Sequence, residues 1–167
     1  KVLTPSKDRV EPKCPVAMQC GGCQIQEMRY EAQLAFKQKM VQNNLERIGG
    51  LSDFEMYPVI GMETPYAYRN KAQFPVGEDK DGNIVIGFYA GRTHHIVEQT
   101  DCCIGAPENG EVLRKVRAYM QKNQIRPYNE EHHSGIVRHI LIRTGYHTKE
   151  IMVCLIVNAA KASCLKN

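Results

Sequence analysis

Three cysteines near the N-terminus constrain this chain more than any other feature. Cys14, Cys20 and Cys23 lie within ten residues, in the stretch CPVAMQCGGCQIQ, and Gly21 and Gly22 separate the last two. Thiolates bind soft metals, and four of them complete either a tetrahedral zinc site or the corners of an iron–sulfur cluster. A glycine pair lets the backbone wrap closely and direct its N–H groups at the sulfurs. The spacing therefore predicts a metal centre whose fourth ligand lies elsewhere in the chain.

The other cysteines favour a cluster over zinc. The chain has seven cysteines and no secretion signal, and the reducing cytosol that we expect around it disfavours disulfides. Zinc ribbons use paired C-x2-C knuckles, whereas the downstream ligands here, Cys102 and Cys103, lie far along the chain. Unrelated free thiols and a regulatory disulfide remain alternatives. Cys154, within IMVCLIV, is predicted to be a buried core residue, and Cys164 lies in a polar tail; neither is expected to be a nucleophile.

Composition places the chain among soluble globular domains. A length of 167 residues fits one domain, and 43% hydrophobic with 24% charged residues is typical of a folded protein. A net charge of +4 does not by itself establish nucleic-acid binding. No apolar stretch approaches the roughly 18 residues of a membrane span, and the N-terminus has no apolar signal core. We therefore expect a cytoplasmic protein without a membrane partner.

Hydrophobic periodicity predicts an α+β fold. Apolar residues spaced three and four apart indicate a helix over Gln24–Ile48, ended by Gly49 and Gly50, and a second helix runs from Pro107 through Met120. Residues 57–98 predict an antiparallel meander, and GIVRHILIRTG with EIMVCLIVN predicts a buried hairpin. We expect an antiparallel sheet of about four to six strands covered by the two helices. Residues 1–23 would form a cysteine-rich cluster-binding loop, and residues 24–167 a central RNA-recognition domain.

Basic residues along the predicted strands suggest contact with RNA. Alternation in YRNKAQFPV gives an apolar face, Tyr68, Ala72, Phe74 and Val76, and a second face, Arg69, Lys71 and Gln73. Phosphate neutralisation by cations, combined with stacking on rings, is how unpaired RNA is bound. The candidate RNA-binding residues are Arg69, Lys71, Arg92, His94, Arg138 and His139. A solvated sheet face or structural ion pairs would explain the same pattern. Adjacent His94-His95 and His132-His133 are not expected to bind zinc, because neighbours on a strand point apart.

Four motifs in order carry a resemblance to a known family. C-x5-C-G-G-C before a helix, then YRNKAQFPV, GFYAGRTHHIVEQTDC and GIVRHILIRTG, resembles the region preceding the catalytic domain of bacterial RNA (uracil-5-)-methyltransferases, especially the ribosomal-RNA enzymes. The resemblance covers most of the chain. It implies a 4Fe-4S cluster ligated by Cys14, Cys20, Cys23 and Cys102, with Cys103 as the alternative fourth ligand.

The resemblance also implies where the chemistry lies. The family methylates uracil with S-adenosylmethionine in a downstream domain, and this chain has neither a glycine-rich nucleotide-binding turn nor an Asp-Pro-Pro-Arg-like loop. We expect a piece of a longer methyltransferase that acts on RNA, ribosomal RNA above all, and is inactive alone. The cofactor S-adenosylmethionine would bind outside it. The alternatives are a redox or oxygen-sensing iron–sulfur protein and a zinc-stabilised interaction module.

Overall fold

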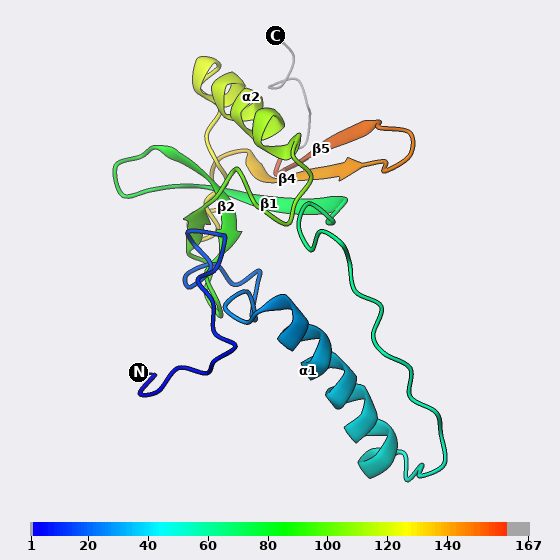
Figure 1. Cartoon of the computed structure of the whole chain (residues 1–167). Helices are drawn as coiled ribbons and strands as arrows, with labels where there is room; N and C mark the ends of the chain where they lie inside the picture. The colour runs from blue at the N-terminus through cyan, green and yellow to red at the C-terminus, as the bar shows by residue number, and fades with distance from the viewer. Residues whose placement is uncertain (1, 160–167) are drawn as a thin grey trace.

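The structure is a computed structural model that describes residues 2–159, and helices and strands account for about two fifths of these residues. Figure 1 shows a sheet, a helix packed on it and a second helix that runs away from it. The elements are α1 (Tyr30–Asn43), the π-helix η1 (Asn44–Ile48), β1 (Lys71–Glu78), β2 (Ile84–Tyr89), β3 (Ile96–Glu98), α2 (Asn109–Lys122), β4 (Val137–Thr144) and β5 (Ile151–Val157). Within the described residues, no helix has the length and apolarity to cross a membrane.

The five strands form one antiparallel sheet in the order β3-β2-β1-β4-β5. With the two helices, this sheet confirms the predicted α+β class and strand number. The meander begins later than predicted, because residues 57–70 contain no strand and β1 starts at Lys71. Pro58 and Pro65 lie in that segment, and proline cannot donate a ladder hydrogen bond.

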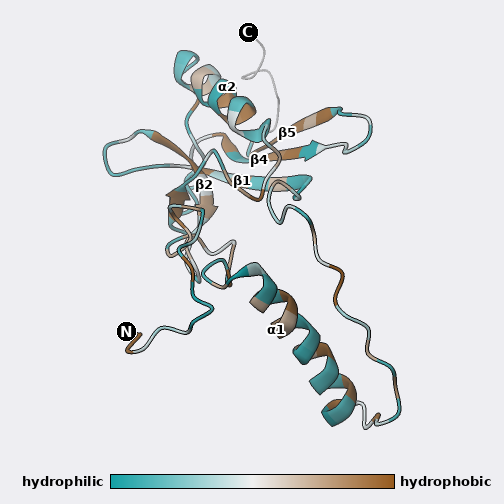
Figure 2. Ribbon diagram, in the orientation of Figure 1, coloured by the Kyte–Doolittle hydropathy of each residue, from teal (hydrophilic) through white to brown (hydrophobic). Residues whose placement is uncertain are grey.

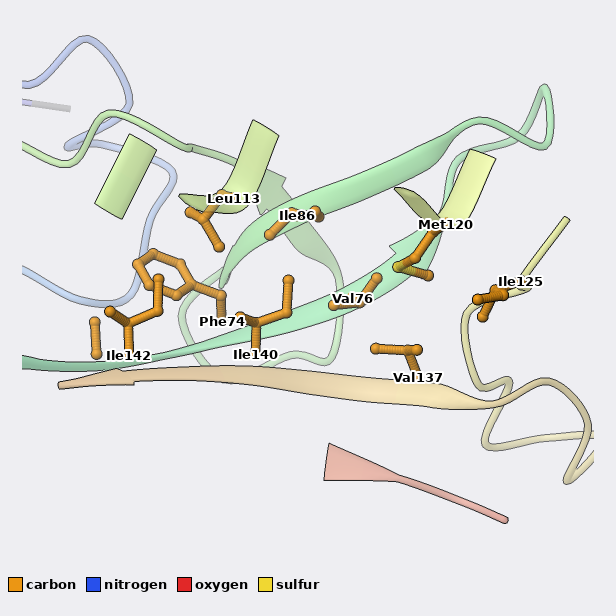
Figure 3. Close-up of a cluster of buried hydrophobic side chains, with 10 residues drawn as sticks. Phe74, Val76, Ile86, Leu113, Met120, Ile125, Val137, Ile140 and Ile142 are labelled. Carbon is orange, nitrogen blue, oxygen red and sulfur yellow. The ribbon is translucent and has the colours of Figure 1, made fainter. Parts of the chain in front are cut away.

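The hydrophobic core lies between α2 and one face of the sheet. Leu113 and Met120 of α2 are fully buried against the strands, as Figure 3 shows. The strands contribute Ala72, Phe74, Val76, Ile86, Val137, Ile140 and Ile142. The predicted alternation on β1 is confirmed from Ala72 to Val76, whereas Tyr68 lies before the strand and is exposed. Among the residues that the structure describes, no helix covers the opposite face of the sheet, and we call this face the open face.

Helix α1 differs from the prediction in two respects. It begins at Tyr30, because residues 24–29 form turns fastened to the N-terminal segment, where Met28 pairs with Arg9. It also does not cover the sheet: it contains no buried residue, and Figure 1 shows it running away from the strands. Its end is as predicted, since Gly50 adopts the left-handed conformation at φ 65° just after η1.

Strand β5 is an edge strand, which corrects the expectation for Cys154. Figure 2 shows β5 as strongly apolar, but the Cys154 side chain is exposed. Cys154 is paired with Leu141 on the open face, where no described element covers it. The predicted hairpin of β4 and β5 is confirmed, although its outer strand is not buried. Cys164 lies outside the described residues.

We predict that Leu113→Ala destabilises the chain by about 2–5 kcal/mol, because it removes a fully buried side chain that joins α2 to the sheet. Gln121→Ala, on the exposed side of the same helix, should change stability by less than about 0.5 kcal/mol. Urea denaturation followed by circular dichroism measures both. Equal effects of the two substitutions would contradict the placement of α2.

Candidate metal centre and RNA-binding surface

The fold brings the N-terminal cysteines against the segment that holds Cys102 and Cys103. The side-chain amide of Gln26 donates hydrogen bonds to Sγ of Cys23 at 3.4 Å and to Sγ of Cys103 at 3.6 Å. The amide of Gln99 donates to Sγ of Cys14 at 3.5 Å. The sequence analysis singled out neither glutamine. Gln26 bridges thiols from the two segments, and Gln99 joins Cys14 to the segment that precedes Cys102.

Electrostatics show the same proximity. Burial raises the pKa of the Cys23 thiol, the hydrogen bond from Gln26 opposes that rise, and the neighbouring thiols of Cys102 and Cys20 add to it. The Arg69 guanidinium acts in the other direction on the Cys23 pKa, so Arg69 lies beside the cysteines. This position separates Arg69 from the other candidate RNA-binding residues.

Both members of the Cys102-Cys103 pair lie near the N-terminal thiols. Burial is the main cause that raises the pKa of Cys103, with Cys14 and Cys102 contributing as neighbouring charges. Within residues 2–159, no three His, Cys, Asp or Glu side chains are arranged to hold a single metal ion. The ligand set Cys14, Cys20, Cys23 and Cys102 therefore stays a prediction.

The cysteine loop is docked on the loop that joins β2 to β3. The Gly21 N–H donates to the carbonyl oxygen of Tyr89 at 2.9 Å, and Cys20 forms an antiparallel bridge with Ala90. A Cβ at Gly21 would lie 3.0 Å from that carbonyl and 3.1 Å from Cα of Gly91. Gly21 is thus required by a close backbone approach, and the N–H of Gly22 points at Sγ of Cys20 at 3.3 Å.

A hollow of about 490 Å³ opens on the sheet face opposite α2. Three of the predicted RNA-binding residues, His94, Arg138 and His139, line it together. The rings of Tyr89 and Tyr128 line it as well. No local signal in the sequence distinguished these two tyrosines from core tyrosines. His95 also faces the hollow, because His94 and His95 lie in a loop and not on a strand.

An irregularity in β4 places two successive cationic or imidazole side chains on the same face. The register shifts between Val137 and His139, while Val137 and Ile140 both point into the core. A bulge of this kind inserts one extra residue and re-aims the side chains beside it. Arg138 and His139 consequently both face the hollow, which explains why this pair interrupts an otherwise apolar strand.

The polar groups of the hollow are organised around one carboxylate. Glu130 accepts from Nη2 of Arg138 at 2.9 Å and contacts Nδ1 of His94 at 3.0 Å, and these two partners lower the pKa of Glu130. The Arg138 guanidinium lies 4.8 Å from the centre of the Tyr128 ring, and the rings of Tyr89 and His94 stack with centres 5.3 Å apart. Two pairs of flat groups are therefore already assembled in the lining of the hollow.

The imidazole of His139 adds a neutral group. Burial lowers the pKa of His139, and the nearby Arg138 guanidinium lowers it further. His139 is therefore uncharged at pH 7 and offers one donor and one acceptor.

The remaining predicted residues lie in different places. Arg92 is exposed in the same loop as His94, with φ 62°. Lys71 lies at the far end of β1 on the open face, directly opposite Arg143 of β4. The side chains of Lys71 and Arg143 are exposed, and within the described residues neither forms a salt bridge. Alternation from His139 along β4 could have indicated Arg143, which the sequence analysis missed.

Comparison with known proteins agrees with the resemblance seen in the sequence. The chain is 50% identical over 155 residues to an uncharacterized RNA methyltransferase, BH0687, of Halalkalibacterium halodurans, covering 93% of the chain and 34% of that protein. It is 45% identical over 161 residues to an uncharacterized RNA methyltransferase of Bacillus cereus, covering 96% and 35%. The chain is similar to RNA methyltransferases over nearly its whole length. It spans about a third of the length of these relatives, and no family model matches it.

A solved methyltransferase shares the fold. The crystal structure of the Pyrococcus abyssi tRNA (uracil-54, C5)-methyltransferase in complex with S-adenosyl-L-homocysteine superposes with a TM-score of 0.72 at 25% identity. The match covers 98% of this chain and 35% of that one. The predicted relationship to RNA methyltransferases is confirmed.

We predict that Gly21→Ala loosens the cysteine loop, because the added methyl group meets the Tyr89 carbonyl and the Gly91 backbone. Gly91→Ala is the matched control, since a Cβ there meets nothing within 4 Å. Amide hydrogen exchange of the loop should accelerate in the first variant and stay unchanged in the second. Equal protection in both variants would show that the loop does not depend on this contact.

Proposed function

We propose that this chain is the cluster-binding and RNA-positioning region of a cytoplasmic, S-adenosylmethionine-dependent RNA (uracil-5-)-methyltransferase that acts on ribosomal RNA. The observation that carries the proposal is the gathering of Cys14, Cys23 and Cys103 by two glutamines, next to a sheet whose open face bears cations and rings. The similarity to proteins named RNA methyltransferases supports it.

The residues fit an iron–sulfur cluster in their chemistry. Cys14, Cys20, Cys23 and Cys102 would hold it, and soft thiolates are the ligands that such clusters take. The side-chain amide of Gln26 and the Arg69 guanidinium would offset the negative charge that thiolates bring to a partly buried site. When bound, the cluster would tie the N-terminal loop to the segment around Cys102 and would also offer one-electron chemistry, which polar methyl transfer does not need.

The chain's part in the reaction is then to hold the RNA. Methyl transfer from S-adenosylmethionine to uracil would take place in a region outside this chain, since the relatives are about three times as long. The open face would present the RNA, with Lys71 and Arg143 for the phosphates. The 167-residue chain by itself should bind RNA and methylate none.

We predict iron and sulfide near four each per chain in anaerobically purified protein, with the visible absorption of a 4Fe-4S cluster. Cys20→Ser should lose this metal, because it removes a ligand. Cys154→Ser, at an exposed position on β5, should keep it. Elemental analysis with a visible spectrum checks all three proteins. Stoichiometric zinc would instead favour an interaction module, and a metal-free chain would remove the cluster from the proposal.

The same assay distinguishes which of the two adjacent thiols, Cys102 or Cys103, is the fourth ligand. We predict that Cys102→Ser abolishes the cluster absorption and that Cys103→Ser retains it, because the resemblance to the methyltransferases implies Cys102 as the fourth ligand. Retention by Cys102→Ser and loss by Cys103→Ser would assign the fourth ligand to Cys103, whose sulfur shares the Gln26 amide with Cys23. That result would leave the proposal of a cluster unchanged.

A further inference from the structure

We propose that the hollow on the open face takes one unstacked base of single-stranded RNA, while the phosphates beside it lie along the sheet toward Lys71 and Arg143. This inference rests on the proposed RNA-positioning function and assigns it a site. The hollow of about 490 Å³ lies within the roughly 300–1,000 Å³ that ligand sites in proteins occupy.

Flat side chains in the lining make the hollow suited to a base. The Arg138 guanidinium covers the Tyr128 ring at 4.8 Å, and the Tyr89 and His94 rings stack at an interplanar angle of 25°. Every base has a π-face, so aromatic rings and guanidinium planes bind unpaired bases with little regard to sequence. Each pair here is already assembled in the free chain, which reduces the ordering needed on binding.

The acidic lining argues that a base, and not a phosphate, enters the hollow. Carboxylates of Glu78, Asp79, Glu130 and Glu131 line it. The positive charge of Arg138 is already neutralised by Glu130, so a phosphate would meet net negative charge. A base carries no charge, and its N–H groups can donate to these carboxylates and to His139, whose lowered pKa keeps it neutral. Nε of Arg138 is buried without a hydrogen-bond partner among the described residues.

The phosphates have a separate place on the same face. Lys71 and Arg143 lie directly opposite each other on β1 and β4, and like charges in that position repel unless an anion joins them. His139 is paired with Pro75, four residues along β1 from Lys71, so the cation pair lies about 13 Å from the hollow at ~3.3 Å per residue. A short single-stranded segment would span this distance.

The test uses the full chain and a short fluorescein-labelled single-stranded RNA at about 0.15 M salt. A second RNA of the same length is abasic at every position, because a chain that accepts any base could shift past a single gap, and a third carries 2-aminopurine at its centre. We expect the abasic RNA to bind about tenfold more weakly than the intact one. The fluorescence of 2-aminopurine should be quenched on binding, because its base stacks on a ring.

Variants separate stacking from charge. Tyr128→Leu and Arg138→Lys should each weaken binding of the intact RNA by about tenfold and leave the abasic RNA unaffected, since both lose a flat group and the second keeps its charge. Tyr128→Phe should bind as the wild type does. Arg143→Gln should weaken both RNAs alike and reduce the salt dependence. Lys122→Gln, on α2 across the sheet, removes the same charge as a control and should have no effect.

The outcomes distinguish this site from the proposed function. Equal binding of the intact and abasic RNAs, or wild-type affinity in both Tyr128→Leu and Arg138→Lys, would overturn the hollow as a base site and leave an RNA-binding chain. A wild-type chain that binds no single-stranded RNA would overturn the RNA-positioning role itself. Circular dichroism checks the fold of each variant, and Arg138→Lys keeps the test decisive if Tyr128→Leu does not fold.

Discussion

The close backbone contact between Gly21 and Tyr89 is the constraint on which both candidate sites depend. The end of β2 and the loop that follows it receive the cysteine loop, because the Gly21 N–H donates to the Tyr89 carbonyl and Cys20 forms a bridge with Ala90. The same loop presents His94 to the hollow, stacked on the Tyr89 ring. The residue that Gly21 contacts, Tyr89, therefore also lines the surface proposed to hold RNA. If the proposed cluster and RNA site both exist, this proximity would couple the partly buried thiols to RNA binding without any redox step.

The two faces of the sheet serve different purposes because only one of them is covered within the described residues. Leu113 and Met120 of α2 bury the inner face, which fixes the register of β1 and β4, since a slip by one residue would turn Phe74 out of the core. With the register fixed, the bulge at Arg138 leaves the side chains of Arg138 and His139 on the open face. The stability of the core thus determines the geometry of the open surface.

The sequence predicted those features that a repeated local pattern specifies. Period-two alternation located Ala72, Phe74 and Val76 in the core because one face of the sheet is buried. Periodicity wrongly predicted that Met28 lies in the first helix. Met28 continues the helical spacing but belongs to the cysteine loop, because it forms a bridge with Arg9. Arg69 shares the alternation of Lys71 yet lies beside Cys23, since it precedes the strand. Tyr128 gave no signal, because no repeated spacing in the sequence links it to its partners His133 and Arg138.

Chain entropy indicates why thiols from distant segments matter to such a fold. The cysteine loop is held by a few hydrogen bonds, each contributing about 1 kcal/mol. A cross-link from Cys23 to Cys102 would close a loop of about 80 residues and lower the entropy of the unfolded chain by an equivalent of about 4.5 kcal/mol. The Cys102 end is itself anchored, because Asp101 receives two hydrogen bonds of 3.0 Å from Arg114 of α2. A centre ligated at both ends would therefore join the cysteine loop to the helix that covers the core, so that the loop under Tyr89 and the sheet would move as one unit.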